Sequence, residues 1–426
     1  MIILKGKKLL ILGGNPSTME IVREAKKQGI YTIVTDWYDT KRSPSKLIAD
    51  EYWNEEVFRP DILAQLVKDK SIDGAFTAYT DSYLLPYQEL CERAKLPCYG
   101  PRSAYETMFS KASFKEACEK AGVPVVPWKK LTQDNYKTEI IGIDYAVAVK
   151  PVDNSGSRGV FKCYDPKDLI MYCEKALDFS QKKEIMVEKL MDVDSEFSAY
   201  YIIHNGEARL SSMGDRYVDV VDEHTAPQAK GMFFPSRLLD AFIEQVDGPV
   251  KRMFKENGMN EGFVFVQGFS EAGKIYLNEI GYRLNGGFTY KFNEYYNGYN
   301  QVHSLLEYAL TGEMDINDLT KTNPHFPGTG LLLTISLKEG KIAKVSGIEE
   351  IKKLEGVYDC VPIHFEGDDL GGKGTSIQIF GYVFCVAKDM RELESVVNEV
   401  RKLLKIEDVE GKDMLLGILD VSQIKK

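Results

Sequence analysis

The sequence contains few histidines, no paired-cysteine motif and no long apolar run, and each absence argues against a class of protein. The 5 histidines lie far apart and form no metal-ligand spacing, which argues against a histidine-bound metal site. The 7 cysteines are an odd number without a Cys-x-x-Cys pair, so we expect reduced thiols that fill the core. No apolar run reaches the roughly 18 residues that a membrane helix needs, so no membrane partner is expected.

Positive charge is also in short supply. The 426 residues carry a formal net charge of -10. Binding to nucleic acid depends on clustered Lys and Arg that neutralise phosphates, so nucleic acid is not an expected partner. The opening residues 1–4 run straight into a charged stretch without the pattern of a secretion signal, and we therefore expect a cytoplasmic protein.

The hydrophobic pattern predicts an α/β protein whose first lobe is built on a parallel sheet. The apolar run Lys8–Leu12 stops at Gly13-Gly14, a helical pattern follows, and a second apolar run covers Tyr31–Val34. This βαβ opening requires parallel strands. Single cores stop growing near about 250–300 residues, so several lobes are expected. We predict four domains, which are 1–105 (Rossmann-like), 106–190 (a small α+β lobe), 191–324 (a large lobe) and 325–426 (β-rich).

Within these domains several elements have clear signals. Helix starts and stops, and β-type runs between turn residues, mark the bounds. The pattern predicts a helix over Lys111–Lys120, strands over Tyr145–Lys150 and Ile185–Glu188, one long helical stretch over Ser236–Asn257, and strands over Gly262–Phe269 and Lys274–Ile280.

The segment from Lys150 to Val160 has the composition of a phosphate-binding loop. A strand ends in Lys150, a small-residue loop that includes Arg158 follows, and an apolar run comes next. Such a loop can lay backbone N–H groups on phosphate oxygens while Lys150 supplies a point charge. A polar hairpin turn with an exposed lysine is the alternative. The segment is not a P-loop, because no Gly-Lys-Ser/Thr follows.

Gln267 and Glu279 flank a predicted hairpin turn at Gly273. Because their numbers lie symmetrically about Gly273, we expect the two side chains to face each other. Amide and carboxylate oxygens suit Mg²⁺, which keeps water or phosphate in its other positions. A solvated polar face is the alternative. Arg283 follows closely, and its planar fork of donors could hold a transferring phosphoryl group or an acyl phosphate.

In this order, the motifs resemble the ATP-grasp superfamily, with a Rossmann-like first lobe and a β-rich C-terminal module. Residues 109–111 ahead of 121–124 are similar to the start of its ATP-binding lobe. The resemblance implies that Lys111 and Lys150 contact the α- and β-phosphates of ATP. It implies that a loop over 153–160 closes on the triphosphate through Ser155, Gly156, Ser157, Arg158 and Gly159.

The resemblance also implies roles around the nucleoside and the metal. The backbone of Glu188, Lys189 and Leu190 would meet adenine, and Glu196 would hold the ribose hydroxyls. Gln267 and Glu279 would bind Mg²⁺, or Mn²⁺ in its place. The expected catalytic residues are Arg283, Lys150 and Arg158.

One position departs from the family pattern. The usual Glu-x-Asn-x-Arg reads Glu279-Ile280-Gly281-Tyr282-Arg283, so Gly281 stands where an asparagine helps to hold a second Mg²⁺. Either Asn285 or a water substitutes, or only one metal is held firmly.

Gln267 as the first metal ligand resembles carbamoyl-phosphate-synthase-like members of this superfamily. The Arg-x-x-Gly-Gly motif that begins at Arg283 and the C-terminal module resemble its carboxylate-amine ligases, including the L-amino-acid ligases that make dipeptides. The resemblance implies an enzyme that forms an acyl phosphate from a small carboxylate and joins it to an amine, with ADP and phosphate as products. A kinase that stops at phosphoryl transfer and a nucleotide-binding protein without catalysis are the alternatives. The substrates stay unidentified, and a homodimer, as many relatives form, stays open.

Overall fold

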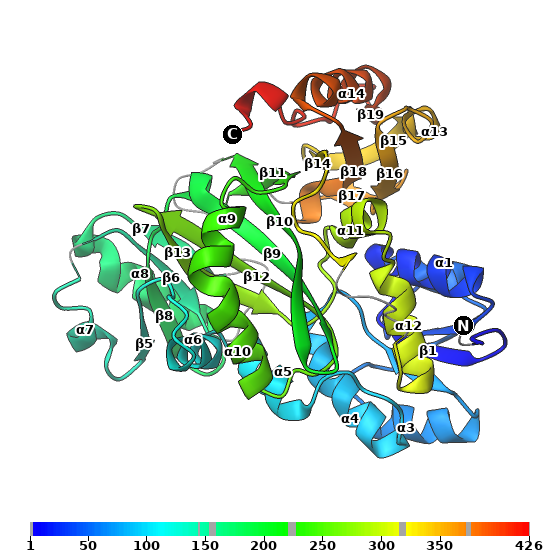
Figure 1. Cartoon of the computed structure of the whole chain (residues 1–426), viewed down its shortest axis with the longest axis horizontal. Helices are drawn as coiled ribbons and strands as arrows, with labels where there is room; N and C mark the ends of the chain where they lie inside the picture. Colours follow the sequence, from blue (N-terminus) through cyan, green and yellow to red (C-terminus); the bar gives the residue numbers. More distant parts are fainter. Residues whose placement is uncertain are drawn as a thin grey trace.

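The N-terminal lobe is built on the predicted parallel sheet. The computed structural model describes residues 3–143, 145–152, 159–219, 227–314, 321–371 and 376–425. Four parallel strands stand in the order β3-β2-β1-β4, and the sheet lies at the right of the view in Figure 1. The strands are β1 (Lys8–Leu12), β2 (Tyr31–Thr35), β3 (Glu51–Trp53) and β4 (Gly74–Phe76), with helices α1 (Met19–Lys27), α2 (Ser45–Ile48), α3 (Pro60–Asp69) and α4 (Leu84–Ala94).

Helix α12 (Gln301–Thr311), which comes much later in the chain, packs against this lobe. It contacts α1, β1 and β4, so the yellow helix lies beside the blue lobe in Figure 1. The close approach requires Gly74, because a Cβ at this position would clash with the carbonyl oxygen of Ala309. The N-terminal lobe therefore takes part of its cover from a segment more than 200 residues away in sequence.

The second lobe is a small α+β unit with its own core. Its four antiparallel strands stand in the order β5-β8-β6-β7 and have a separate buried cluster that includes Leu131, Val149 and Ile185. Helices α5 (Arg102–Phe109) and α6 (Lys111–Lys120) precede the sheet. The sheet and its helices are β5 (Trp128–Thr132), α7 (Tyr136–Glu139), β6 (Val147–Pro151), β7 (Phe161–Cys163), α8 (Leu169–Phe179) and β8 (Glu184–Lys189).

A single antiparallel sheet of 8 strands forms the centre of the molecule, in the order β13-β12-β9-β10-β11-β14-β18-β16. It crosses the expected domain boundary at 324/325, because β11 pairs with β14 through Gly231 and Leu333. The C-terminal segment thus extends the sheet of the large lobe. The strands are β9 (Glu196–His204), β10 (Glu207–Asp219), β11 (Gln228–Phe234), β12 (Gly262–Glu271), β13 (Lys274–Gly281), β14 (Thr329–Ser336), β16 (Val357–Pro362) and β18 (Ile379–Ala387).

A smaller sheet and one long helix complete the C-terminal segment. Three strands stand in the order β17-β15-β19, and α14 packs against β14 and β18 at the top of Figure 1. Leu393, Val397 and Val400 of α14 belong to a buried cluster with Leu331 and Leu333 of β14. The elements are β15 (Gly340–Ser346), α13 (Ile348–Ile351), β17 (Asp369–Leu370), α14 (Met390–Leu403) and β19 (Lys405–Asp408).

The predicted helical stretch over 236–257 is helical but not uniform. It consists of α9 (Leu239–Phe242), a π-helical turn at Ile243–Asp247, and α10 (Gly248–Glu256). Pro249 explains the break, because proline has no N–H to donate and its ring collides with the carbonyl four residues earlier. A wider π turn just before the proline relieves that collision.

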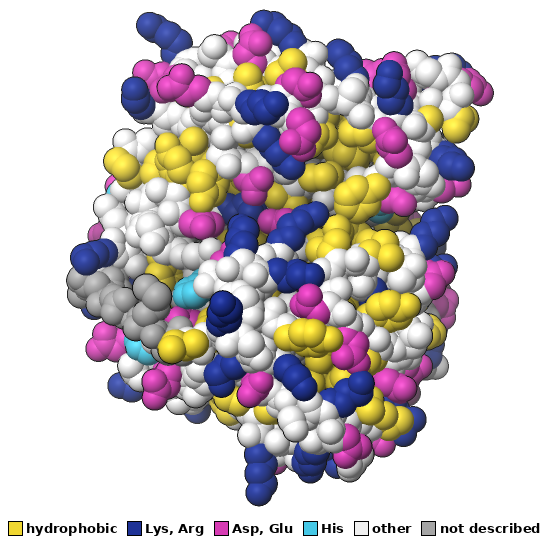
Figure 2. All heavy atoms as spheres, turned by 90° about the vertical axis from the view of Figure 1, so that its right-hand side faces the viewer, with side chains coloured by type: hydrophobic (Ala, Val, Ile, Leu, Met, Phe, Trp, Pro, Cys, Tyr) yellow, Lys and Arg dark blue, Asp and Glu magenta, His cyan; other side chains and the backbone are white. Residues whose placement is uncertain are grey.

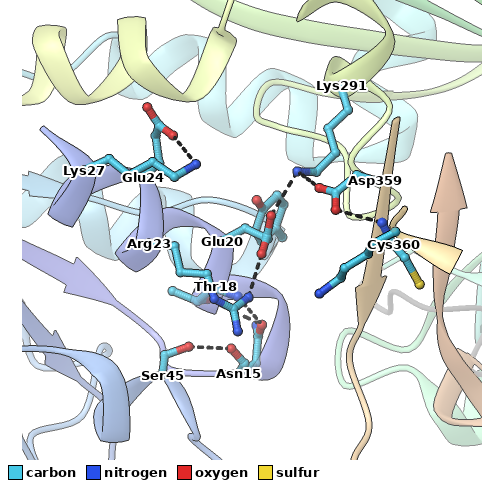
Figure 3. A network of polar contacts seen from close by, with 12 residues as sticks. Asn15, Thr18, Glu20, Arg23, Glu24, Lys27, Ser45, Lys291, Asp359 and Cys360 are labelled. Carbon is cyan, nitrogen blue, oxygen red and sulfur yellow. Dashed lines mark hydrogen bonds and ion pairs between the residues drawn. The ribbon is translucent and has the colours of Figure 1, made fainter. Parts of the chain in front are cut away.

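Three parts of the chain meet at Lys291, which lies in α11 (Tyr290–Asn297). Its Nζ lies 3.0 Å from Oε2 of Glu20 in α1 and 2.6 Å from Oδ2 of Asp359 in β16, as Figure 3 shows. Burial disfavours the charge on Lys291, but the two carboxylates outweigh this effect and raise its pKa. One ammonium group therefore joins the N-terminal lobe, the central region and the C-terminal segment.

The charged side chains are dispersed over the face that lies at the right of Figure 1. In Figure 2, Lys and Arg side chains are interspersed with Asp and Glu side chains and with smaller hydrophobic areas. Each helix of the described part of the chain is too short or too polar to cross a membrane.

Candidate active site

A cavity of about 470 Å³ lies between the small lobe and the central sheet. Its size falls in the range of small-molecule and cofactor sites. The small lobe contributes Lys111 at the start of α6 and Lys150 in β6, and the central sheet contributes Arg216 in β10. The hairpin β12–β13 contributes Gln267, Asn278 and Glu279. The structure thus brings most of the predicted site residues around one space.

Two lysines from different elements meet at the buried side chain of Glu188. Nζ of Lys150 lies 2.5 Å from Oε2 of Glu188, and Nζ of Lys115 lies 3.0 Å from Oε1. Burial alone would raise the pKa of Glu188, but the ion pairs with Lys150 and Lys115 outweigh it and lower this pKa. The structure therefore gives the side chain of Glu188 a role in holding Lys150, in addition to the backbone contact predicted for this residue.

Lys115 was not predicted from the sequence, although it pairs with Glu188, which lines the cavity. Its side chain is 0% exposed, and Nζ also donates to the carbonyl oxygen of Val126 at 3.2 Å. Burial lowers the pKa of Lys115, and the nearby carboxylate of Glu188 opposes this shift. On sequence its only signal is position, since Lys111 and Lys115 are four residues apart and so lie on one face of the helix.

Lys111 begins α6, where Ser110 caps the helix by accepting a hydrogen bond from the N–H of Ser113. Burial lowers the pKa of Lys111, while the carboxylate of Glu279 opposes the shift and Lys150 adds to it. These three charges are therefore close enough to influence one another across the cavity.

Gln267 and Glu279 face each other as predicted, but for a different reason. The turn is centred between Ala272 and Gly273, and simple pairing from that centre would put Asn278 opposite Gln267. A bulge between Gln267 and Gly268 shifts the register, so that Gln267 pairs with Glu279 and Gly268 with Leu277. Asn278 is the extra residue, and its side chain also lines the cavity.

Two family models match parts of the chain, and several solved structures have a similar fold. Residues 117–292 match the family model described as D-ala D-ala ligase C-terminus. Residues 333–409 match the family model described as L-amino acid ligase C-terminal domain 2. The crystal structure of an L-amino acid ligase from Bacillus licheniformis superimposes with a TM-score of 0.78 at 18% identity and covers 95% of this chain and 99% of that one.

The chain has the ATP-grasp fold. A D-alanine–D-alanine ligase from Clostridium acetobutylicum is 21% identical and covers 65% of this chain and 88% of its own length. The biotin carboxylase domain of a 2-oxoglutarate carboxylase from Hydrogenobacter thermophilus, solved with MgADP, ADP and bicarbonate, gives a TM-score of 0.75 at 18% identity. It covers 94% of this chain and 91% of that one. At this identity the structural likeness shows the ATP-grasp fold.

Arg283 lies outside the main cavity in this ATP-grasp structure. Its Nε and Nη2 donate to the two carboxylate oxygens of Asp81, each at 2.6 Å, and Nη1 donates to the carbonyl oxygen of Leu284. The guanidinium lies over the ring of Phe265 at 5.2 Å from its centroid. A small neighbouring cavity contains Arg283 and shares Asn285 and Thr289 with the main one. A phosphate contact of Arg283 stays a prediction.

Arg216, which the sequence analysis missed, is an arginine that faces the cavity. Its Nη1 donates to Oε1 of Glu196, the residue predicted to hold the ribose. Glu196 raises the pKa of Arg216, and Glu279 acts in the same direction. The sequence offered one signal, a charged pair, Asp215-Arg216, inside an otherwise uncharged run that begins at Leu210. Alternate residues of a strand point to opposite faces, so the two charged side chains of this pair point to different sides of the sheet.

In the segment predicted to contact adenine, two backbone N–H groups donate hydrogen bonds to other parts of the protein. Lys189 donates to the carbonyl oxygen of Pro127 at 2.9 Å, and Leu190 donates to that of Ala146 at 2.8 Å. Lys189 and Leu190 both line the cavity. A base bound here would have to use other groups of the segment, and its contact with this backbone stays a prediction.

Of the loop predicted to bind phosphate, the structure describes only the end. Ser155, Gly156, Ser157 and Arg158 lie outside the described residues. Gly159 has a φ of +76°, and a Cβ there would collide with the side chain of Phe179. The chain therefore needs glycine where it leaves the loop and enters β7.

The donor atoms around the hairpin fit Mg²⁺. Gln267 Nε2 donates to Oγ of Ser198 at 3.1 Å, which leaves its amide oxygen as the acceptor for a cation beside Glu279. Mg²⁺ is commonly bound by one or two protein oxygens while water and phosphate complete its shell. Among the described residues no group of three or more His, Cys, Asp or Glu offers an alternative metal site.

Proposed function

We propose that this ATP-grasp protein is a carboxylate-amine ligase that uses ATP and Mg²⁺ and proceeds through an acyl phosphate. The observation that carries the proposal is the single cavity in which Lys111, Lys150 and Arg216 surround the oxygen pair of Gln267 and Glu279. Cations from separate lobes and a pair of oxygen ligands are what a triphosphate with its metal requires. The ligase domains matched by residues 117–292 and 333–409 support the same proposal.

The reaction needs positioning and charge neutralisation more than covalent chemistry from the protein. A carboxylate oxygen attacks the γ-phosphorus, the bond between this phosphorus and its bridging oxygen breaks, and ADP leaves. The amine nitrogen then attacks the acyl carbon, phosphate leaves, and the nitrogen loses a proton. Lys111 and Lys150 would hold the phosphates of ATP, and Gln267 and Glu279 would hold Mg²⁺, which neutralises the charge that develops on the transferred group.

The composition of the cavity wall favours a substrate with an apolar side chain. The part formed by β11, β14 and β18 is lined by Met232, Leu332, Ile379 and Tyr382. Apart from the hydroxyls of Thr334 and Tyr382, the side chains of this wall are apolar. An amino acid with an apolar side chain would bury that side chain here while its carboxylate lies nearer to Arg216 and the metal.

The test is phosphate release from MgATP with amino acids offered singly and in pairs, followed by mass spectrometry. We expect phosphate release that requires two substrates, and a product whose mass is the sum of both minus water. A stable product heavier by one phosphoryl group would make the protein a kinase. Nucleotide binding without turnover in all mixtures, when apolar amino acids are included, would favour a binding protein that has lost catalysis.

A further inference from the structure

The packing around Gly281 leaves no room for the asparagine side chain that the family pattern has at this position unless a neighbouring side chain moves. A Cβ on Gly281 would collide with the ring of Phe265, which is its cross-strand partner in β12. The same ring supports the guanidinium of Arg283. Position 281 therefore supplies no side-chain oxygen, and a second metal would have to take this ligand from elsewhere.

Asn285, the first alternative from the sequence, already has a structural role. Its Oδ1 accepts a hydrogen bond from the N–H of Gly287 at 2.8 Å. This contact closes the turn that contains the Gly286-Gly287 pair, as asparagine side chains commonly do in turns. Using this oxygen for a metal would open the turn.

The side-chain oxygen of Asn278 accepts no hydrogen bond from the described residues. Asn278 is the extra residue of the β13 bulge, it precedes Glu279 directly, and it lines the cavity. Its Oδ1 is also buried. Buried polar atoms are almost always paired, so an unpaired one beside a ligand cavity calls for a partner that is absent from the protein alone.

The bulge that carries Asn278 is held in place from the small-lobe side. The N–H of Leu277 donates to the carbonyl oxygen of Pro124 at 2.9 Å, and the N–H of Val126 donates to the carbonyl oxygen of Leu277 at 3.0 Å. Lys115 in turn donates to the carbonyl oxygen of Val126. The backbone of residues 124–126 therefore contacts Lys115 and also fixes Leu277, the residue next to Asn278.

We propose that Asn278 supplies the amide oxygen for a second Mg²⁺ when nucleotide is bound, in place of the missing asparagine at position 281. This inference rests on the proposed function, since it assumes a metal–nucleotide complex in the cavity. Rotation of the amide about χ2 turns the oxygen, and it breaks no hydrogen bond that this oxygen makes with the described residues. A neutral amide oxygen is a ligand type that Mg²⁺ accepts.

The experiment counts Mn²⁺ bound per chain by electron paramagnetic resonance, in the presence of a non-hydrolysable ATP analogue. Wild type should bind two Mn²⁺, and Asn278→Ala should bind one tightly, with the second weakened by about 10- to 100-fold. Asn278→Asp keeps an oxygen at this place and should keep two. Asn285→Ala and the exposed Asn260→Ala should also keep two.

The outcomes separate this inference from the proposed function. Two Mn²⁺ with unchanged affinity in Asn278→Ala would overturn the role of Asn278, and so would a single Mn²⁺ in wild type. Absence of any nucleotide-dependent Mn²⁺ in wild type would overturn the proposed function itself. Thermal unfolding and binding of ADP in the presence of a chelator report whether each variant folds and keeps its nucleotide site without metal.

Discussion

Gln267 and Glu279 face each other across β12 and β13 because a bulge at Asn278 moves the strand register by one residue. If the register of Glu271 and Lys274 continued without the bulge, the side chain opposite Gln267 would be that of Asn278, and Glu279 would lie opposite Val266, whose side chain is buried. A small irregularity in one strand thus decides which oxygen atoms share the cavity with the lysines.

Lys150→Ala should lower turnover by about 100- to 1,000-fold, which is typical for loss of one group that stabilises developing charge. The variant also leaves Glu188 paired with Lys115 alone. The measurement is steady-state phosphate release with saturating MgATP. Lys130→Ala is a matched control, because its side chain is 41% exposed and pairs with Glu184 in the same sheet. Equal losses in both variants would argue against a role in phosphate binding.

Arg283→Ala should abolish turnover more than it weakens ATP binding, since an interaction with the transferred group is strongest in the transition state. We expect kcat to fall by about 100-fold or more while the KM for ATP changes little. Wild-type turnover in this variant would refute the prediction. Asp81→Asn tests a purely structural role, because it weakens the same ion pair but leaves the guanidinium, and it should lose much less activity.

Lys291→Met should destabilise the fold by about 1–3 kcal/mol, because Glu20 and Asp359 lose the partner that compensates their burial. Burial would raise the pKa of Glu20, but Lys291 outweighs it and lowers this pKa below its ordinary value of 4.5. The ion pair therefore stabilises the folded state fully above this value, and its contribution is lost as the pH falls through the lowered pKa. Thermal unfolding at pH 7 and at successively lower pH should show the gap between wild type and variant closing. A gap that stays constant would contradict the linkage.

Gly281→Ala should destabilise the protein by about 1–3 kcal/mol, since its Cβ would overlap the ring of Phe265. Chemical denaturation of the single variant and of Gly281→Ala with Phe265→Leu gives the measurement. The double variant should recover part of the loss, because the smaller side chain makes room. Gly273→Ala is an informative comparison, because its Cβ would meet no atom within 4 Å and any cost there arises from its φ of +76°. A stable Gly281→Ala variant would remove the packing argument for this position.

Local elements followed from the sequence wherever the hydrophobic period was clear. The predicted strand over Lys8–Leu12 and helix over Lys111–Lys120 have these same bounds in the structure. The pairing of Gln267 with Glu279 was also predicted, although the bulge that produces it has no signal in a single sequence.

Relationships between distant segments could not be predicted in the same way. The pair of Asp81 and Arg283 joins residues 202 positions apart, and the pairing of β11 with β14 crosses a segment that reads as a domain boundary. Neither contact leaves a periodic pattern, because each depends on how complete lobes pack. Arg216 was missed for a related reason, since a single charged residue in a strand does not reveal which face will meet a cavity.

The pairing of β11 with β14 also has a consequence for protein engineering. A chimera that exchanges the segment after residue 324 for that of another ligase would have to rebuild the backbone hydrogen bonds between Gly231 and Leu333 and their neighbours. The same graft would replace Leu332, Ile379 and Tyr382, which form one wall of the cavity. Substitution of these three side chains leaves the pairing of β11 with β14 intact, and it is therefore the less disruptive way to alter substrate preference.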